Sequence, residues 1–140
     1  MALGEYESTG INIDAAISSQ LIENIFEHNT PLHDGAVIIR NNKVVAATCY
    51  LPLTGRTDLN KDLGTRHRAA VGISEVSDSV TIVVSEENGQ ISIAQGGILY
   101  SNLDVEELRK RLTSLQTGKN AQSKKGRRAK RIKGGKKNEK

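Results

Sequence analysis

Apolar residues recur at helical spacing in three stretches of the chain. In residues 14–28 they return every three or four positions, which predicts an amphipathic helix. Residues 66–76 and 105–115 are predicted as two further helices, and the small side chains of Ala70 and Gly72 predict close packing of the second one. The expected N-caps are Asp14, Thr65 and Asp104, and the apolar faces comprise Ile17, Leu21, Ile22, Ile25 and Phe26 in the first helix and Val105, Leu108 and Leu112 in the third.

Short runs rich in β-branched residues predict strands between these helices. The first two runs are joined by Asn41-Asn42-Lys43, where asparagine tolerates the positive φ of a tight hairpin. Gly89 and the pair Gly96-Gly97 mark turns between the later runs. The predicted strands span residues 36–40, 44–50, 80–85, 91–94 and 98–100. This order of elements predicts an α/β fold, with a central mixed twisted sheet flanked by helices.

Charge divides the chain into two parts. The 140 residues carry a formal net charge of +4, but residues 1–117 carry −6 and residues 118–140 carry +10. We expect residues 1–117 to form one domain with a single core. Residues 118–140 lack a sustained apolar pattern, so they are expected to form a disordered basic tail. Anionic lipid and nucleic acid both remain open as partners of such a tail.

Cysteine content and hydropathy indicate the compartment. Cys49 is the single cysteine, which rules out an intrachain disulfide and fits a reducing environment. No apolar run approaches the roughly 18 residues that cross a bilayer, and no secretory signal pattern begins the chain. The chain as given is expected to be soluble and cytoplasmic.

One segment with the residue types of a binding site is Leu32-His33-Asp34-Gly35-Ala36, at the start of a predicted strand. The Asp34 carboxylate can hold a divalent cation, and the neighbouring His33 imidazole suits manganese better than magnesium. Gly35 offers a backbone amide that a ligand can approach without a Cβ in the way. Taken alone, however, an Asp-Gly pair is more often only a turn.

A second such segment is Gly64-Thr65-Arg66-His67-Arg68, at the start of a predicted helix. Free amides and the helix dipole favour an anion there, so cationic side chains are explained best by a bound phosphate. A solvated basic turn paired with surface acids explains this segment equally well. Ser85-Glu86-Glu87, at a strand end, is a weaker third segment, for which a polar strand end is the simpler explanation. P-loop, Gly-x-Gly-x-x-Gly and zinc-spacing motifs are absent from the sequence.

Together, Asp34-Gly35-Ala36 and Gly64-Thr65-Arg66-His67-Arg68 resemble the two signature motifs of the bacterial diadenylate cyclase domain. The resemblance covers roughly residues 5–110 and is closest to the membrane-anchored class of Gram-positive bacteria. It implies that each subunit binds one ATP and that two subunits face each other as a homodimer. The implied reaction condenses two ATP into cyclic di-AMP and releases two pyrophosphates.

The resemblance also implies roles for individual residues. Asp34 and Arg66 would be catalytic, with Asp34 and His33 holding a divalent metal, Mn²⁺ or Mg²⁺ with Co²⁺ as a third candidate. Residues expected to contact ATP are Gly35, Ala36, Tyr50, Leu51, Gly64, Thr65, Arg66, His67, Arg68, Ser85 and Glu86. Regulatory protein partners are also left open.

The chain departs from the anchored class at its start. Members of that class carry membrane helices, then a helix and an apolar strand, before the segment that resembles residues 6–14. We therefore expect this chain to lack a strand of the sheet, while a longer protein with the membrane helices would lie at the cytoplasmic face of the membrane. Two alternatives to the enzyme remain: a nucleic-acid-binding protein acting through the basic tail, and a nucleotide sensor or degenerate cyclase that binds ATP without turnover.

Overall fold

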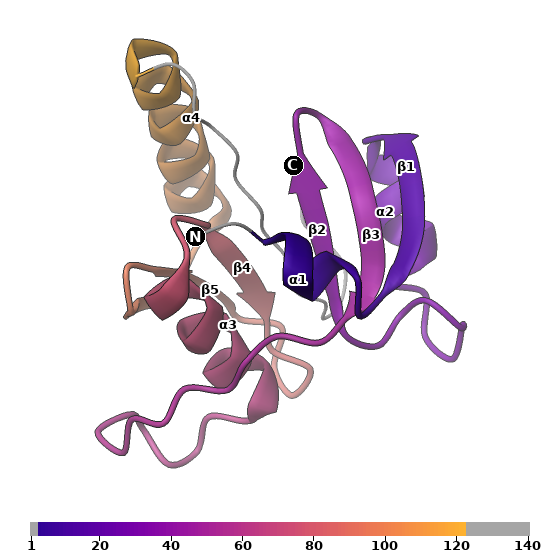
Figure 1. The fold of residues 1–140 in the computed structure, drawn as a ribbon. Helices are drawn as coiled ribbons and strands as arrows, with labels where there is room; N and C mark the ends of the chain where they lie inside the picture. Colours follow the sequence, from indigo (N-terminus) through magenta and orange to yellow (C-terminus); the bar gives the residue numbers. More distant parts are fainter. Residues whose placement is uncertain (1–2, 123–140) are drawn as a thin grey trace.

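The computed structural model describes residues 3–122 and the side chains as far as Leu115. Four helices and six strands follow one another along these residues (Figure 1). The helices are α1 (Gly4–Glu7), α2 (Ser19–Ile25), α3 (Thr65–Val76) and α4 (Val105–Gln122). The strands are β1 (Ile11–Ala16), β2 (Ala36–Arg40), β3 (Lys43–Cys49), β4 (Thr81–Val84), β5 (Ile91–Gln95) and β6 (Ile98–Leu103).

The strands form two antiparallel sheets of three strands each, in the orders β1-β3-β2 and β4-β5-β6 (Figure 1). The predicted α/β class is confirmed, but the single central mixed sheet is not formed by the described residues. Short turns join β2 to β3 and β4 to β5 to β6, and strands joined this closely pair only antiparallel. The longer passage through α3 leads from the first sheet into the second.

The first predicted helix is shorter than expected and begins later. Residues 11–16 form strand β1 on the outer side of β3, and Asp14 has a φ of 51° inside it. The prediction of Asp14 as N-cap is therefore wrong. Ser18 caps α2 instead, because its hydroxyl accepts the backbone N–H of Leu21 at 3.1 Å. The alternation of Ile11 and Ile13 with polar residues is typical of a strand, but no strand was predicted for these residues.

The hairpin between β2 and β3 forms as predicted. Asn41 and Asn42 take φ values of 54° and 63°, the left-handed conformation that asparagine tolerates better than most residues. A register shift between Ala36 and Ile38 marks a bulge on the facing β3, where Thr48 also has a positive φ of 54°. Thr48 lies directly before Cys49 and Tyr50, so the bulge sets the direction in which the chain leaves β3.

Helix α3 spans almost the predicted residues and packs as closely as its small side chains predicted. Its N-cap is Gly64, with no side-chain hydrogen bond, so the prediction of Thr65 as N-cap is wrong by one position. Ala70 and Val71 are fully buried against the second sheet. At Gly72 an added Cβ would lie 2.0 Å from the Pro52 carbonyl oxygen, which leaves no room for a larger residue.

Helix α4 begins as predicted and continues further. Asp104 and Glu107 form a reciprocal capping box, each backbone N–H donating to the other's carboxylate at 2.8 Å. Leu108 is buried, but Val105 is 59% exposed and does not belong to the packed face as predicted. The helix runs to Gln122, past the predicted end near residue 115 and past the domain boundary expected at 118. Residues 123–140 of the predicted disordered tail lie outside the described residues.

The helices cover both sheets and connect them. On the first sheet, α2 covers one face through Ile22 and Ile25, while α1 lies on the other side of β3 (Figure 1). Helix α3 joins the sheets because its Ile73 packs with β2 and β3 while its Ala70 and Val71 pack with β4 and β5. Helix α4 covers the remaining face of the second sheet through Leu108. No helix in residues 3–122 is long and apolar enough to cross a bilayer.

Candidate functional site

The loop that enters β2 presents an imidazole beside a carboxylate. Asp34 is 86% exposed at its side chain, and its Oδ1 lies 3.7 Å from Nε2 of His33. Nδ1 of His33 lies 2.9 Å from the Thr30 carbonyl oxygen, which can only accept a hydrogen bond. A hydrogen bond at this contact requires a proton on Nδ1, and Nε2 is the ring nitrogen that faces Asp34. The role of Thr30 was not predicted, because a Thr-Pro pair in a sequence does not indicate that its carbonyl will contact a ring nitrogen of His33.

Gly35 holds this loop against the bulge of β3. Its φ of 83° favours glycine, and an added Cβ would lie 2.8 Å from the backbone of Thr48. On the side where a Cβ would lie, Gly35 is therefore in contact with the protein's own backbone. The contact places Asp34 at a fixed position relative to the end of β3, where Tyr50 follows.

Arg66 spans from the first turn of α3 to the end of β4. Its guanidinium donates to the Val84 carbonyl oxygen at 3.3 Å and forms an ion pair with Glu86 at 3.2 Å. Burial lowers the pKa of Arg66, and the negative charges of Glu86 and Asp34 partly oppose this. Arg66 and Asp34, far apart in sequence, therefore lie within electrostatic reach of each other.

His67 and Arg68 differ in what they offer at the same turn. Burial first, and then the positive charge of Arg66, lowers the pKa of His67, while Glu87 opposes the shift. His67 is therefore neutral at neutral pH and adds no positive charge. Arg68 is half-buried, and its backbone carbonyl accepts the N–H of Thr54 at 3.1 Å. Of the three basic side chains in this turn, Arg66 and Arg68 therefore supply the positive charge.

Ser85 follows β4 and is already engaged in its own turn. Its hydroxyl oxygen accepts the backbone N–H groups of Glu87 at 3.1 Å and Asn88 at 3.4 Å. Its hydroxyl proton remains available as a donor within the described residues. Glu86, 71% exposed at its side chain, reaches the site by its ion pair with Arg66. The third motif therefore meets the second through Glu86.

Tyr50 and Leu51 follow the end of β3. Tyr50 is 72% exposed, and its backbone N–H donates to the Thr9 hydroxyl at 2.8 Å. Leu51 is partly buried against the core that contains Leu3. The Ala36 side chain is buried in the same core, and any ligand contact by Ala36 must use its backbone. Gly64 and Thr65 are exposed at the start of α3.

The donor set of the predicted metal site fits a divalent cation that takes further ligands from a substrate. His33 and Asp34 supply one ring nitrogen, Nε2, and one exposed carboxylate on adjacent residues. A carbonyl that fixes the other nitrogen of a ligating histidine is common at protein metal sites, and Thr30 provides it. Within residues 3–122, no three histidine, cysteine, aspartate or glutamate side chains are already arranged around one point.

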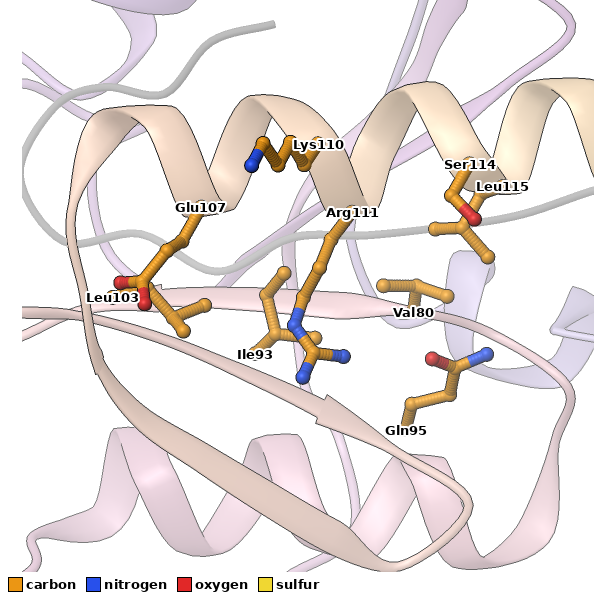
Figure 2. Close-up of a pocket in the computed structure, with 9 residues that line it drawn as sticks. All are labelled: Val80, Ile93, Gln95, Leu103, Glu107, Lys110, Arg111, Ser114 and Leu115. Carbon is orange, nitrogen blue, oxygen red and sulfur yellow. The ribbon is translucent and has the colours of Figure 1, made fainter.

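A pocket of about 460 Å³ lies elsewhere, between α4 and the second sheet (Figure 2). Its apolar floor includes Val80 and Ile93, and Arg111 points into it from α4 with its guanidinium 4.0 Å from the centre of the Tyr100 ring. None of the predicted site residues lines it. The residues of the two motifs therefore lie outside this pocket.

Comparison with known families identifies the domain. The sequence profile described as "DisA bacterial checkpoint controller nucleotide-binding" matches residues 1–99. The chain belongs to this family. The resemblance to diadenylate cyclases drawn from the two motifs is thereby confirmed.

Relatives and solved structures agree with the assignment. The chain is 57% identical over 110 residues to the cyclic di-AMP synthase CdaA of Bacillus subtilis, and 59% identical over 108 residues to a diadenylate cyclase of Listeria monocytogenes. These matches cover 79% and 77% of this chain but only 40% of each relative, so the chain spans less than half of their length.

Among solved structures, a double mutant of DacA from Staphylococcus aureus matches with a TM-score of 0.79 and 48% identity, over 81% of this chain and 76% of that one. A Bacillus cereus protein described as membrane spanning matches with a TM-score of 0.71 and 47% identity, over 74% of this chain and 51% of that one. The α/β fold of the chain is thus that of the DacA structure.

Proposed function

We propose that this domain is a diadenylate cyclase that condenses two ATP molecules into cyclic di-AMP. The observation that carries the proposal is the 57% identity to a cyclic di-AMP synthase over 110 residues that include both motifs. In the reaction, each ribose 3′-oxygen forms a bond to the α-phosphorus of the other nucleotide. The bond from that phosphorus to the β-phosphate oxygen breaks, and one pyrophosphate leaves from each ATP.

The triphosphate binds at the first turn of α3. Arg66 supplies a charge whose direction is held by the Val84 carbonyl and Glu86, so little reorganisation is needed when the phosphate charge develops. Gly64, Thr65 and Arg68 present exposed amides, a hydroxyl and a second cation at the same helix start. Ser85 donates its hydroxyl proton to a phosphate oxygen, and neutral His67 contributes a hydrogen bond without adding charge.

Asp34 and His33 act on the attacking ribose. The exposed Asp34 carboxylate and the Nε2 lone pair of His33 would hold a divalent metal, with Mn²⁺ and Co²⁺ favoured over Mg²⁺ by the imidazole. When bound, the metal supplies positive charge that favours ionisation of the 3′-hydroxyl and stabilises the phosphate. Gly35 keeps Asp34 in register with β3, so the carboxylate is positioned before substrate arrives.

The adenine contacts the exposed ring of Tyr50 and the backbone of Leu51, at the end of β3. Ala36 and Gly35 offer backbone groups to the same nucleotide. Each chain holds one ATP, and two chains face each other as a homodimer so that the hydroxyl of one nucleotide meets the α-phosphate of the other. A longer protein of this class would act at the cytoplasmic face of the membrane, where regulatory proteins and anionic lipid are further partners.

Incubation of the protein with ATP and MnCl₂, followed by chromatography for cyclic di-AMP, tests the proposal directly. Asp34→Asn is expected to lower the rate by at least about a hundredfold, since the carboxylate acts on the reacting groups, while the melting temperature stays close to that of the parent chain. Asp62→Asn, an exposed substitution outside the motifs, serves as the control and is expected to keep full activity. Undiminished synthesis by Asp34→Asn would remove Asp34 from the mechanism.

A truncated chain and a calorimetric measurement of ATP binding distinguish the enzyme from the two alternatives. A chain that ends at Gln122, the last residue of α4, is expected to retain synthesis, whereas a nucleic-acid-binding protein acting through its tail would lose its activity. A degenerate cyclase would bind ATP in calorimetry and yield no cyclic di-AMP. The relatives matched above are named as cyclases, which favours the enzyme over both.

A further inference from the structure

We propose that Thr9 is a positioning residue that fixes Tyr50 and thereby sets where the adenine ring binds. The proposal deepens the function proposed above and rests on it, because Tyr50 is the residue proposed there to contact the adenine. Thr9 lies between α1 and β1, outside both motifs and 41 positions before Tyr50 in the sequence. Only the folded chain brings these two residues together.

The Thr9 hydroxyl joins two backbone segments by hydrogen bonds. Its oxygen accepts the backbone N–H of Tyr50 at 2.8 Å, and its proton is donated to the carbonyl oxygen of Tyr6, in α1, at 2.7 Å. Both distances are typical of well-formed hydrogen bonds. One side chain therefore ties α1 to the residue that follows β3, and α1 itself lies beside β3 (Figure 1).

The two hydrogen bonds differ in what remains when the hydroxyl is lost. The Tyr6 carbonyl also accepts the backbone N–H of Thr9 at 3.1 Å, so it keeps a donor without the hydroxyl. For the Tyr50 N–H, the Thr9 hydroxyl is the one acceptor that residues 3–122 provide. Removal of the hydroxyl therefore acts mainly on Tyr50.

The end of β3 before Tyr50 is held by packing and does not depend on this hydroxyl. At Gly10 an added Cβ would lie 2.3 Å from the Ala47 carbonyl oxygen and 2.6 Å from Sγ of Cys49, so the chain after Thr9 is pressed against β3. Ala47 and Cys49 are buried. Tyr50 is 72% exposed, so little packing holds its side chain, and the bond to Thr9 holds its backbone.

The position of the Tyr50 backbone limits how well its ring can meet an adenine. A ring that is placed before the nucleotide arrives binds it at a lower cost in ordering. Aromatic rings prefer offset-stacked or edge-to-face arrangements, so a shift of the Tyr50 ring weakens its contact with the base. The triphosphate, proposed to bind at the first turn of α3, does not use this contact. The Thr9 hydroxyl should therefore strengthen binding of the adenine and leave binding of the triphosphate unchanged.

Calorimetry on the intact chain with MnCl₂ and two probes tests the proposal. The probes are 3′-deoxy-ATP, which lacks the attacking hydroxyl and cannot react, and inorganic tripolyphosphate, which lacks the base. Thr9→Val replaces the hydroxyl by a methyl group of similar size. Its affinity for 3′-deoxy-ATP should fall about fivefold to tenfold, as expected for one lost hydrogen bond, while its affinity for tripolyphosphate should change by less than about twofold. Thr9→Ser keeps the hydroxyl and should bind both probes within about twofold of the parent chain.

Two controls separate positioning from a general loss of structure. Thr57→Val makes the same change at an exposed threonine in the loop between β3 and α3 and should leave both affinities unchanged. In a chain that already carries Tyr50→Ala, adding Thr9→Val should lower the affinity for 3′-deoxy-ATP by less than about twofold, because the ring that Thr9 positions is absent.

A full loss of affinity from Thr9→Val in the Tyr50→Ala chain would overturn the proposal. Equal losses for the two probes, an unchanged affinity of Thr9→Val for 3′-deoxy-ATP, an equal loss in Thr9→Ser, or no binding of 3′-deoxy-ATP by the parent chain would each overturn it as well. Synthesis of cyclic di-AMP by the parent chain, measured separately, decides the proposed function. A parent chain that binds 3′-deoxy-ATP but makes no cyclic di-AMP would refute the enzyme, while the affinities would still decide the role of Thr9.

Discussion

At the residue scale, Gly72 determines how closely α3 approaches the loop that follows β3. An added Cβ would meet the Pro52 carbonyl oxygen at 2.0 Å and the Thr54 nitrogen at 2.9 Å. Gly72→Ala should therefore force the loop away from α3 and lower the free energy of unfolding by about 1–3 kcal/mol. Urea denaturation measures the change. Gly55→Ala is the matched control, because nothing lies within 4 Å of its Cβ; equal stability of the two variants would contradict the packing described here.

Cys49 makes a specific contribution to the dependence of stability on pH. Burial, and secondarily the charge of Glu7, raises the pKa of its thiol from 9.0 to about 11. The folded state binds this proton more tightly than the unfolded state, so the contribution is complete below about pH 9 and is lost as pH rises through about 11. Thermal melts of the parent chain should therefore show a loss on the order of 2 kcal/mol between these pH values.

The Cys49→Ala variant isolates this effect. Its overall stability is lower because a buried group is truncated, but its melting temperature should fall less steeply between pH 9 and pH 11. Parallel slopes for the variant and the parent chain in this range would show that another group causes the loss. Slow alkylation of the folded chain at pH 8 is a second expected outcome, since the buried thiol is protonated there.

At the scale of the element, substitutions near the start of α2 distinguish the observed helix, capped by Ser18, from the longer helix predicted over residues 14–28. Ser18 accepts the N–H of Leu21, while Asp14 lies in β1 and pairs with Lys43 at the surface. Ser18→Ala should cost about 1 kcal/mol, whereas Asp14→Asn, which keeps tolerance of a positive φ, should cost less than about 0.5 kcal/mol. Chemical denaturation followed by circular dichroism measures both. A larger loss for Asp14→Asn would instead support the longer helix expected from periodicity.

At the scale of the whole molecule, the two sheets have unequal edges. β2 and β4 each stand at an end of their sheet, yet Val37 and Ile38 on β2 and Ile82 and Val83 on β4 are all buried. Successive residues point to opposite faces, so both faces of each strand are covered, as in the interior of a larger sheet. The strands at the other two ends, β1 and β6, contain exposed and partly buried residues and no fully buried ones. This difference supports the proposal that an additional apolar strand pairs with β2 or β4.

An extended chain tests this proposal. Fusing a short segment rich in Val and Ile to the N-terminus should raise the urea midpoint and slow hydrogen exchange at the amides of β2 or β4. An extension of the same length with proline at alternate positions cannot pair along its edge and should give no protection. Equal protection by both extensions, or by neither, would count against the additional strand.

Local patterns in the sequence determined much of the fold and selected the candidate site residues. Hydrophobic periodicity and turn residues located α3, the start of α4, the hairpin of β2 and β3, and the strands β4 to β6 within a few residues, because these features depend on neighbours in sequence. The two motifs selected Asp34 and Arg66, since the residue types of a phosphate and metal site are visible without coordinates. β1 and α1 were missed: a short strand is defined by its partner, and α1 has only four residues.

Tertiary structure alone decided how these parts meet. Only the fold brings the end of β4 to Arg66, sets Asp34 within its electrostatic reach, and packs Gly35 on the backbone of Thr48. The same is true of the lowered pKa of His67, because it depends first on burial. Sequence patterns carry the chemistry of individual side chains, while their distances and solvation come from long-range packing.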